Sequence, residues 1–371
     1  MTRNTGLDVL RGLLLVLMTV THIPTSIGAA FGQPFGYVSA AEGFVLLSGF
    51  IAGLVFSRRL ERDGPDALRN ALQRRAAQIY LCHVALLMFL FTIVASLGQS
   101  LQQPAITNML GFFFDRPLSA TLGGLLLLYR PPLLDILPMY AIFLLLTPAV
   151  LAYGARGGWT KLLAGSVVLW LGAQFGLGDH LYRTLGDLLR VPVPLEATGA
   201  FVLPAWQLLW LIGLWLGAAE AAERNPLARL PRGAVAAAVV LAVLFLLWRH
   251  IVGQTPLPDW PVPNELFSKW RLGPLRLLNL AALVICVARL GPALLRVVPA
   301  SGFLRTLGSA SLPVFCIHLV LALVALLILG ADQTHPLWMD VTVLVLSFTL
   351  LHRTAQLSLA RKSAVRGGSQ A

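Results

Sequence analysis

The stretch Leu7–Pro24 reads LDVLRGLLLVLMTVTHIP, a long apolar run that carries Arg11 near its start and His22 near its end. Ionisable groups in such a run are unfavourable in lipid, so each is a candidate functional residue. An α-helix turns by about 100° per residue, which leaves Arg11 and His22 about 20° apart around the axis and about 16 Å apart along it. Asp8 lies three residues before Arg11 and is close enough to pair with it. The stretch predicts a membrane-spanning helix whose polar face points into a bundle or a water-filled cavity.

Arg11 and His22 each have an ordinary structural explanation as well. Arg11 is placed to extend its charge from a helix end to the membrane surface. His22 is placed to bond a backbone carbonyl near the other surface. Their shared face favours a functional role for both.

The composition of the whole chain agrees with a membrane protein. Its 371 residues are 57% hydrophobic and only 12% charged, with a mean hydropathy of +0.78, whereas a soluble domain has about 25% charged residues. We expect an all-α polytopic membrane protein, a bundle of about ten transmembrane helices in a single domain over residues 1–371. The predicted spans are 9–27, 37–57, 76–97, 133–153, 160–177, 201–219, 233–249, 274–290, 308–330 and 337–352.

The net charge of +12 predicts the topology rather than a nucleic-acid partner. The basic residues are scattered and not interleaved with aromatic ones, which argues against nucleic-acid binding. With the N-terminus in the cytosol, 20 of the 28 basic residues fall on the inner side and 8 on the outer side. This asymmetry predicts that both termini are cytosolic. We also expect the first helix to be retained rather than cleaved as a signal peptide.

The longest outer loop, 98–132, is the one candidate for an ordered cap. Its apolar segment 118–129 is too short to span a membrane, so it is expected to be interfacial or re-entrant. The three cysteines, odd in number and without metal spacing, are interpreted as small buried hydrophobic residues, and neither a disulfide framework nor a metal site is implied. They are Cys82, Cys286 and Cys316.

Glu42, in the stretch SAAEGFVLLSGFIAGLVF, begins the second span at about the depth of His22. We expect its carboxylate to reach the His22 imidazole, where it would fix the tautomer and raise the basicity. The alternative is an acidic residue that is favoured at a helix start by the helix dipole. The small residues of this span predict close helix packing: Gly43, Ser48, Gly49 and Gly53.

Four further residues are candidates for substrate binding. Arg74 and Arg75 open the third span on the inner side, where they either hold phosphates or anchor the helix at the membrane surface. Asp135 opens the fourth span on the outside. His318 lies within the ninth span and either makes an interhelical hydrogen bond or lines the reaction site. No GxSxG, Walker, HExxH or dinucleotide-binding motif is present in the sequence.

Several short motifs occur in an order that resembles a known family. They are LDVLRG followed by His22, SAAEGFVLLSGFIAGLVF, RRAAQIYLCHVAL, LLDILPMY, PAWQLLWLIGLWLG and LGSASLPVFCIHLVL. Together they resemble the OpgC family, named for the succinyltransferase of osmoregulated periplasmic glucans, within the wider acyltransferase-3 group. The similarity covers essentially the whole chain.

The resemblance implies a ten-helix enzyme of the bacterial inner membrane that moves an acyl group, of succinyl or acetyl type, from cytosolic acyl-CoA to a hydroxyl of a periplasmic glycan. It implies that His22 is catalytic and that Arg11 is a structural or donor-binding residue. The wider group has two arginines three residues apart on the third helix, and here Arg75 is present but Gln78 takes the second place. Arg74 and Arg75 are therefore the expected contacts of the CoA phosphates. The acyl-CoA is a substrate, and no permanently bound cofactor is expected.

Two other functions fit ten spans with buried polar residues. A transporter or flippase predicts internal repeats and matched broken helices in two halves, and no repeat is evident in the sequence. A non-catalytic partner of a glycan synthase predicts that His22 and Glu42 can be replaced without effect. Within the acyltransferase hypothesis, direct transfer and a covalent acyl-histidine relay both stay open.

Overall fold

The computed structural model describes residues 5–297 and 302–368, and every regular element in these two ranges is helical. This confirms the all-α fold for the described residues. The α-helices are α1 (Thr5–His22), α2 (Ser26–Phe31), α3 (Ala40–Phe89), α4 (Ala95–Ser100), α5 (Pro104–Met109), α6 (Gly111–Asp115), α7 (Pro117–Leu125), α8 (Ile136–Tyr153), α9 (Trp159–Gln174), α10 (Leu177–Leu189), α11 (Leu203–Ala221), α12 (Arg232–Val252), α13 (Pro261–Asn264), α14 (Pro274–Val297), α15 (Gly302–Ser309), α16 (Ser311–Leu329) and α17 (Leu337–Gly368). The π or 3₁₀ turns are η1 (Leu90–Val94), η2 (Gly154–Gly158), η3 (Leu195–Ala197), η4 (Pro226–Arg229) and η5 (Glu265–Phe267).

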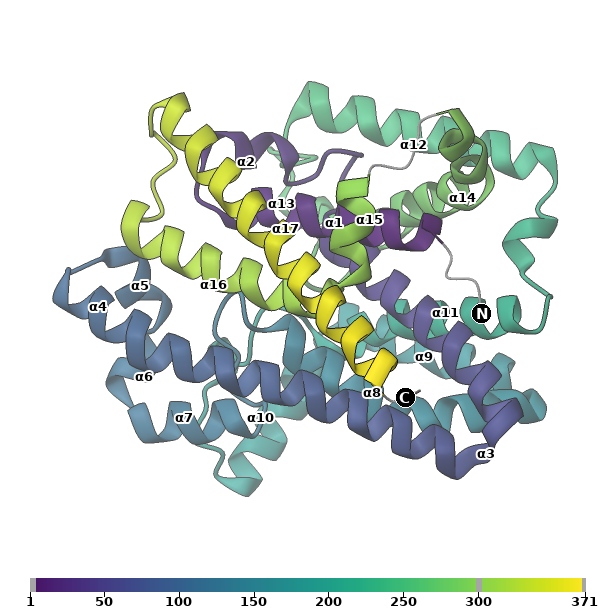
Figure 1. Cartoon of the computed structure of the whole chain (residues 1–371), viewed down its shortest axis with the longest axis horizontal. Helices are drawn as coiled ribbons and strands as arrows, with labels where there is room; N and C mark the ends of the chain where they lie inside the picture. Colours follow the sequence, from purple (N-terminus) through teal and green to yellow (C-terminus); the bar gives the residue numbers. More distant parts are fainter. Residues whose placement is uncertain (1–4, 298–301, 369–371) are drawn as a thin grey trace.

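Two glycines break the longest helical runs. Gly64 has a φ of 80° and a ψ of 177°, and Pro65 follows it, so α3 is divided there into two arms that run in different directions. Gly157, with a φ of 87°, separates α8 from α9 in the same way. Figure 1 shows the bend of α3 at one end of the long axis, with α4 and α5 at the other. We call these the Gly64 end and the His22 end, because α1 runs from the first toward the second.

Seven helical runs in the described residues are long and apolar enough to cross a membrane. They are Thr5–His22, Ala40–Ser100, Ile136–Gln174, Arg232–Val252, Pro274–Leu295, Ser311–Leu329 and Leu337–Ala364. The second and third contain the glycine breaks and hold two predicted spans each, and α11 carries one more. All ten predicted spans therefore overlap helices, while ten crossings and cytosolic termini stay predictions.

Glycines bring α3 and α11 into backbone contact, as the small residues of the second span predicted. A Cβ on Gly49 would lie 2.6 Å from the carbonyl oxygen of Trp210. Gly53 meets the backbone of Leu214, and Gly217 meets that of Phe50. Both helices thus present a Gly-x-x-x-Gly face, the pattern that lets helices approach closely in lipid. This packing fixes the first arm of α3, which carries Glu42 at its start and Ser48 at its centre.

The predicted outer loop 98–132 is mostly helical and folds back against α3. The hydroxyl of Tyr80 donates to the carbonyl of Leu125 at 3.0 Å, and His83 bonds the carbonyl of Gly124 at 3.2 Å. The end of α7 therefore lies beside the middle of the second arm of α3. Leu118 and Leu122, one turn apart on α7, are 72% and 51% exposed. An exposed apolar stripe fits an interfacial and a re-entrant segment alike, so both alternatives stay predictions.

Candidate functional site

His22 and His318 meet where α1 ends and α16 completes its second turn. Nδ1 of His22 lies 3.0 Å from Nε2 of His318, and Nδ1 of His318 lies 2.7 Å from the carbonyl oxygen of Phe315. The two rings are stacked, with centroids 5.3 Å apart and planes 19° apart. His318 is fully buried and His22 is half-buried. Of the two alternatives for His318, the structure thus contains the interhelical hydrogen bond.

This hydrogen-bond chain assigns the tautomers of both histidines. A carbonyl oxygen can only accept, so Nδ1 of His318 carries a proton and donates it to Phe315. The neutral His318 ring then offers Nε2 as an acceptor, and Nδ1–H of His22 donates to it. Nε2 of His22 is left with a free lone pair, which is what a general base requires. His318 therefore takes the orienting place that we expected Glu42 to take.

His22 lines a large cavity at the His22 end of the bundle, with a volume of about 860 Å³. The ring faces of Tyr129, Phe201 and Trp270 form part of its wall. Three charged side chains that are buried or half-buried also line it: Arg130, Asp135 and Lys269. Asp135 accepts a hydrogen bond from the backbone N–H of Ala200 at 3.4 Å. The cavity thus combines apolar walls with a few polar groups, as small-molecule sites do.

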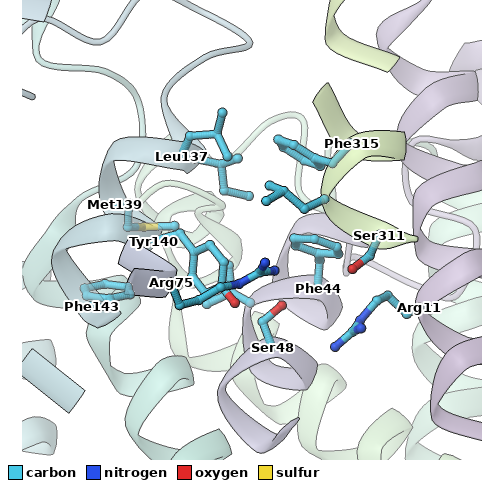
Figure 2. Close-up of a pocket in the computed structure, with 13 residues that line it drawn as sticks. Arg11, Phe44, Ser48, Arg75, Leu137, Met139, Tyr140, Phe143, Ser311 and Phe315 are labelled. Carbon is cyan, nitrogen blue, oxygen red and sulfur yellow. The ribbon is translucent and has the colours of Figure 1, made fainter. Parts of the chain in front are cut away.

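A second, narrow pocket of about 40 Å³ approaches the same place from the direction of the Gly64 end. Figure 2 shows the polar ends of Arg11, Ser48, Arg75 and Ser311 turned toward one another around it. Phe315 lines both this pocket and the large cavity, as does Ile136. The two spaces are therefore separated by little more than Phe315 and Ile136, next to the histidine pair.

The structure separates two arginines that the sequence grouped together. Arg75 faces the narrow pocket, and its Nη1 also donates to Oε1 of Gln78 at 3.3 Å. Arg74, one residue earlier, is exposed and does not line the pocket. Asp8, predicted to stand beside Arg11 at the mouth of the first helix, is buried and accepts from the hydroxyl of Ser309 at 3.2 Å.

Glu42 does not contact His22, contrary to our expectation. One of its carboxylate oxygens accepts from Nη1 of Arg276 at 2.6 Å, in an ion pair that is almost completely buried. The other accepts from the backbone N–H of Ser39 at 3.1 Å and from its hydroxyl at 2.5 Å. The bond from the Ser39 N–H is half of a capping box, in which the Ser39 side chain in turn accepts from the backbone N–H of Glu42. Both carboxylate oxygens thus have hydrogen-bond partners at the start of α3. This agrees with the alternative interpretation of Glu42, an acidic residue that is favoured at the start of a helix. Glu42 anchors the wall of the cavity, which includes Ser39.

Lys269 lies in the loop before α14 and lines the cavity beside His22, although no motif in the sequence marks it as a site residue. Its ammonium is 4.8 Å from the centre of the Trp270 ring and makes no ion pair within the described ranges. Burial lowers the pKa of Lys269 below that of an ordinary lysine; the negative charges of Glu42 and Asp135 oppose this shift, and Arg276 adds to it. The one hint in the sequence was that Lys269 is the sole lysine among the eight basic residues predicted to be outside.

The loop that carries Lys269 is held firmly. Side chains from α9 and α11 donate to three consecutive backbone carbonyls: Trp206 Nε1 to Trp270 at 3.0 Å, Gln174 Nε2 to Arg271 at 2.7 Å, and Trp170 Nε1 to Leu272 at 2.9 Å. The backbone N–H of Val202 adds a bond to the carbonyl of Trp270 at 3.2 Å. These bonds hold the backbone next to Lys269 in place, and electrostatic stabilisation of a reaction depends on charges that are positioned in advance.

Comparison with known proteins identifies the family. The chain matches none of the curated proteins and none of the solved structures. A family model described as OpgC protein matches residues 3–363, which is nearly the whole chain. The chain therefore belongs to the OpgC family, and this membership indicates a membrane protein that acts as a transferase in the modification of glucans.

Proposed function

We propose that this protein is an O-acyltransferase that moves an acyl group from acyl-CoA to a hydroxyl of a glucan or another envelope glycan. One observation carries the proposal above the others. The hydrogen-bond relay from Phe315 through His318 to His22 stands where a narrow pocket with two arginines meets a large cavity. A general base at the junction of two substrate spaces suits group transfer between two substrates.

The narrow pocket is the proposed entry of the donor. CoA is a polyanion, and arginine binds phosphate oxygens with strong, charge-assisted hydrogen bonds. Arg11 and Arg75 both line this pocket. Its remaining wall is largely apolar, with Phe44 stacked on Phe315 at 5.5 Å, and this suits a thin acyl-pantetheine chain. The positive-inside asymmetry supports a cytosolic location for this end, and in the proposed inner-membrane setting acyl-CoA is available on that side.

The large cavity is the proposed acceptor site, open toward the periplasm. In the reaction, Nε2 of His22 takes the proton of a sugar hydroxyl while the hydroxyl oxygen attacks the thioester carbonyl. The tetrahedral intermediate collapses, the carbon–sulfur bond breaks, and the CoA thiolate leaves. The thiolate then receives the proton from His22, so the products are an O-acyl ester and CoA thiol. An acyl-histidine relay would use the same base as a nucleophile.

Lys269 is proposed to stabilise the negative charge that develops on the thioester carbonyl oxygen. It lines the cavity with His22, it is held on a braced loop, and its charge is not neutralised by an ion pair in the described residues. A positive group held close to the place where negative charge develops is effective in this role. Asp135 and Arg130 are proposed to contact the sugar, because both line the cavity.

The test is acyl transfer by purified protein in proteoliposomes, with labelled acyl-CoA on one side and glucan on the other. Succinyl-CoA and acetyl-CoA are compared as donors. His22→Ala is expected to abolish labelling of the glucan, because it removes the proposed base. His180→Gln, an exposed histidine outside both cavities, is the matched control and is expected to keep wild-type activity. Mass spectrometry of envelope glycans from a deletion strain and from a His22→Ala strain provides the cellular counterpart.

Two outcomes would overturn the proposal. Full acyl transfer by His22→Ala would show that His22 is not the base, and it would favour a non-catalytic partner of a glycan synthase. Two spaces that nearly meet within a membrane bundle are also what a carrier presents. Solute or glycan flux across proteoliposomes that contain no acyl donor, together with no transfer when the donor is added, would favour the transporter.

A further inference from the structure

A separate hollow of about 460 Å³ lies beside the large cavity, between α6, α10 and residues 191–195. We call it the α10 hollow. It is walled in part by rings, from Phe112, Tyr182 and Pro194. The wall is braced, since the hydroxyl of Tyr182 donates to the carbonyl of Val193 at 2.7 Å and the N–H of Val191 donates to that of Gly186 at 2.8 Å.

The α10 hollow is lined by equal numbers of positive and negative side chains, and these do not pair with one another. Two arginines and two aspartates line it: Asp115, Arg116, Arg183 and Asp187. Within the described part of the chain, these four side chains form neither ion pairs nor side-chain hydrogen bonds with one another or with other residues. All four side chains are exposed to solvent, and a hollow with equal numbers of positive and negative groups has no net charge that would favour an anion or a cation. It suits an uncharged ligand with many hydroxyl groups, since each hydroxyl both donates and accepts.

The α10 hollow adjoins the cavity that holds His22. Phe112 lines both spaces, and so does Pro194. The Phe112 ring is fixed edge-on against Tyr129, with centroids 5.1 Å apart. Phe112 and Pro194 thus form a common edge of the two spaces, so a chain of sugar rings bound in the cavity would reach the hollow across these two residues.

We propose that the α10 hollow is a second subsite that binds uncharged sugar units of a polymeric acceptor, several units away from the one that is acylated. This inference rests on the proposed function. It predicts that the protein distinguishes a long acceptor from a short one by groups that lie away from the base. Arg183 and Asp187, one turn apart on α10, hold hydroxyls of the remote units by charge-assisted hydrogen bonds.

The test compares Arg183→Gln and Asp187→Asn with Arg190→Gln, an exposed arginine at the end of α10 that does not line the hollow. The probes are a single glucose and a series of longer glucose oligomers. Loss of a hydrogen bond to a charged group corresponds to a decrease in affinity of about tenfold or more. We expect KM for the long oligomers to rise by that factor in the two hollow variants, with KM for glucose unchanged, and no change for either probe in Arg190→Gln.

A long-oligomer KM that stays at the wild-type value in both hollow variants would overturn the subsite. An equal rise for glucose and for long oligomers would do so as well, because it would indicate a general distortion. If the wild-type protein transfers no acyl group, the proposed function fails, and calorimetric titration with the same oligomers still decides the subsite. Tighter binding of long oligomers than of glucose, lost in the two hollow variants and kept in Arg190→Gln, supports it, and equal binding refutes it.

Discussion

Replacing His318 with Phe separates the role of its nitrogen from the role of its ring. The His318 ring stacks on His22 and meets Phe315 edge-on, with centroids 4.9 Å apart at 67°. A phenyl ring can occupy the same fully buried space. The carbonyl of Phe315 loses one donor but keeps its bond from the helix backbone. The principal loss is therefore the acceptor for Nδ1–H of His22.

The expected effect on catalysis follows from that single lost acceptor. A buried donor left without a partner costs about 1–3 kcal/mol, which corresponds to about 5- to 150-fold in rate. His22 then also becomes free to adopt the other tautomer, in which Nε2 carries the proton and no lone pair faces the substrate. In the serine protease triad, an exchange that gives the wrong tautomer costs about 10⁴ in kcat. We expect His318→Phe to lower kcat by about 100-fold or more.

The assay measures kcat and KM for acyl-CoA together with thermal unfolding. KM for acyl-CoA should change little, because Arg11 and Arg75 are untouched. His318→Gln is the comparison, since its amide oxygen can accept from Nδ1–H of His22, and it should retain more activity than His318→Phe. Wild-type kcat in His318→Phe would refute the tautomer assignment. Equal losses in both variants, with equally lowered melting temperatures, would reduce His318 to a packing residue.

Three other predictions follow from the structure. Arg75→Gln should raise KM for acyl-CoA about tenfold or more, with little effect on kcat, whereas Arg74→Gln, outside the pocket, should leave both constants at wild-type values in steady-state kinetics. Lys269→Met should lower kcat by about 10²- to 10³-fold. Because burial lowers the pKa of Lys269, wild-type activity should be lost with rising pH at a pH below the usual pKa of a lysine. Lys269→Arg should move that fall to higher pH, and an unmoved pH profile would contradict the charge role. Gly53→Ala should destabilise the protein by about 1–3 kcal/mol because a Cβ meets the α11 backbone, whereas Gly165→Ala, with open space around it, should not lower the melting temperature.

The apolar pattern of α1 predicted a helix with Arg11 and His22 on one face. It did not predict which other parts of the chain would surround these two residues. Arg11 and His22 share a face of one helix, and helix geometry alone gives their angle and separation. The structure places them in adjoining spaces, with Arg11 at the narrow pocket and His22 at the cavity. The close packing of the second span was also predictable, because Gly-x-x-x-Gly spacing leaves a helix face bare.

The partners of His22 and Glu42 depend on contacts between distant parts of the chain. His22 and His318 are 296 residues apart, and Glu42 and Arg276 are 234 residues apart. The expectation that Glu42 would reach His22 rested on similar depth in the membrane and on a short connecting loop. Depth does not decide which neighbouring helix supplies the partner. In the structure the capping box and Arg276 hold the carboxylate at the helix start, and α16 supplies the imidazole instead.

Because His22 contacts His318 and not Glu42, the electrostatics of the proposed reaction differ from those that we expected. A carboxylate beside His22 would stabilise the imidazolium that forms when the base takes a proton, whereas neutral His318 does not. Glu42 is neutralised by Arg276. The cavity is also lined by Glu196, but this residue is exposed and its charge is screened by water. Of the buried or half-buried charges, Arg130 and Lys269 outnumber Asp135 by one. This excess positive charge opposes a lasting imidazolium and favours the oxyanion and the departing thiolate. On the proposed mechanism, His22 therefore holds the proton only briefly, and the leaving thiolate takes it as the carbon–sulfur bond breaks.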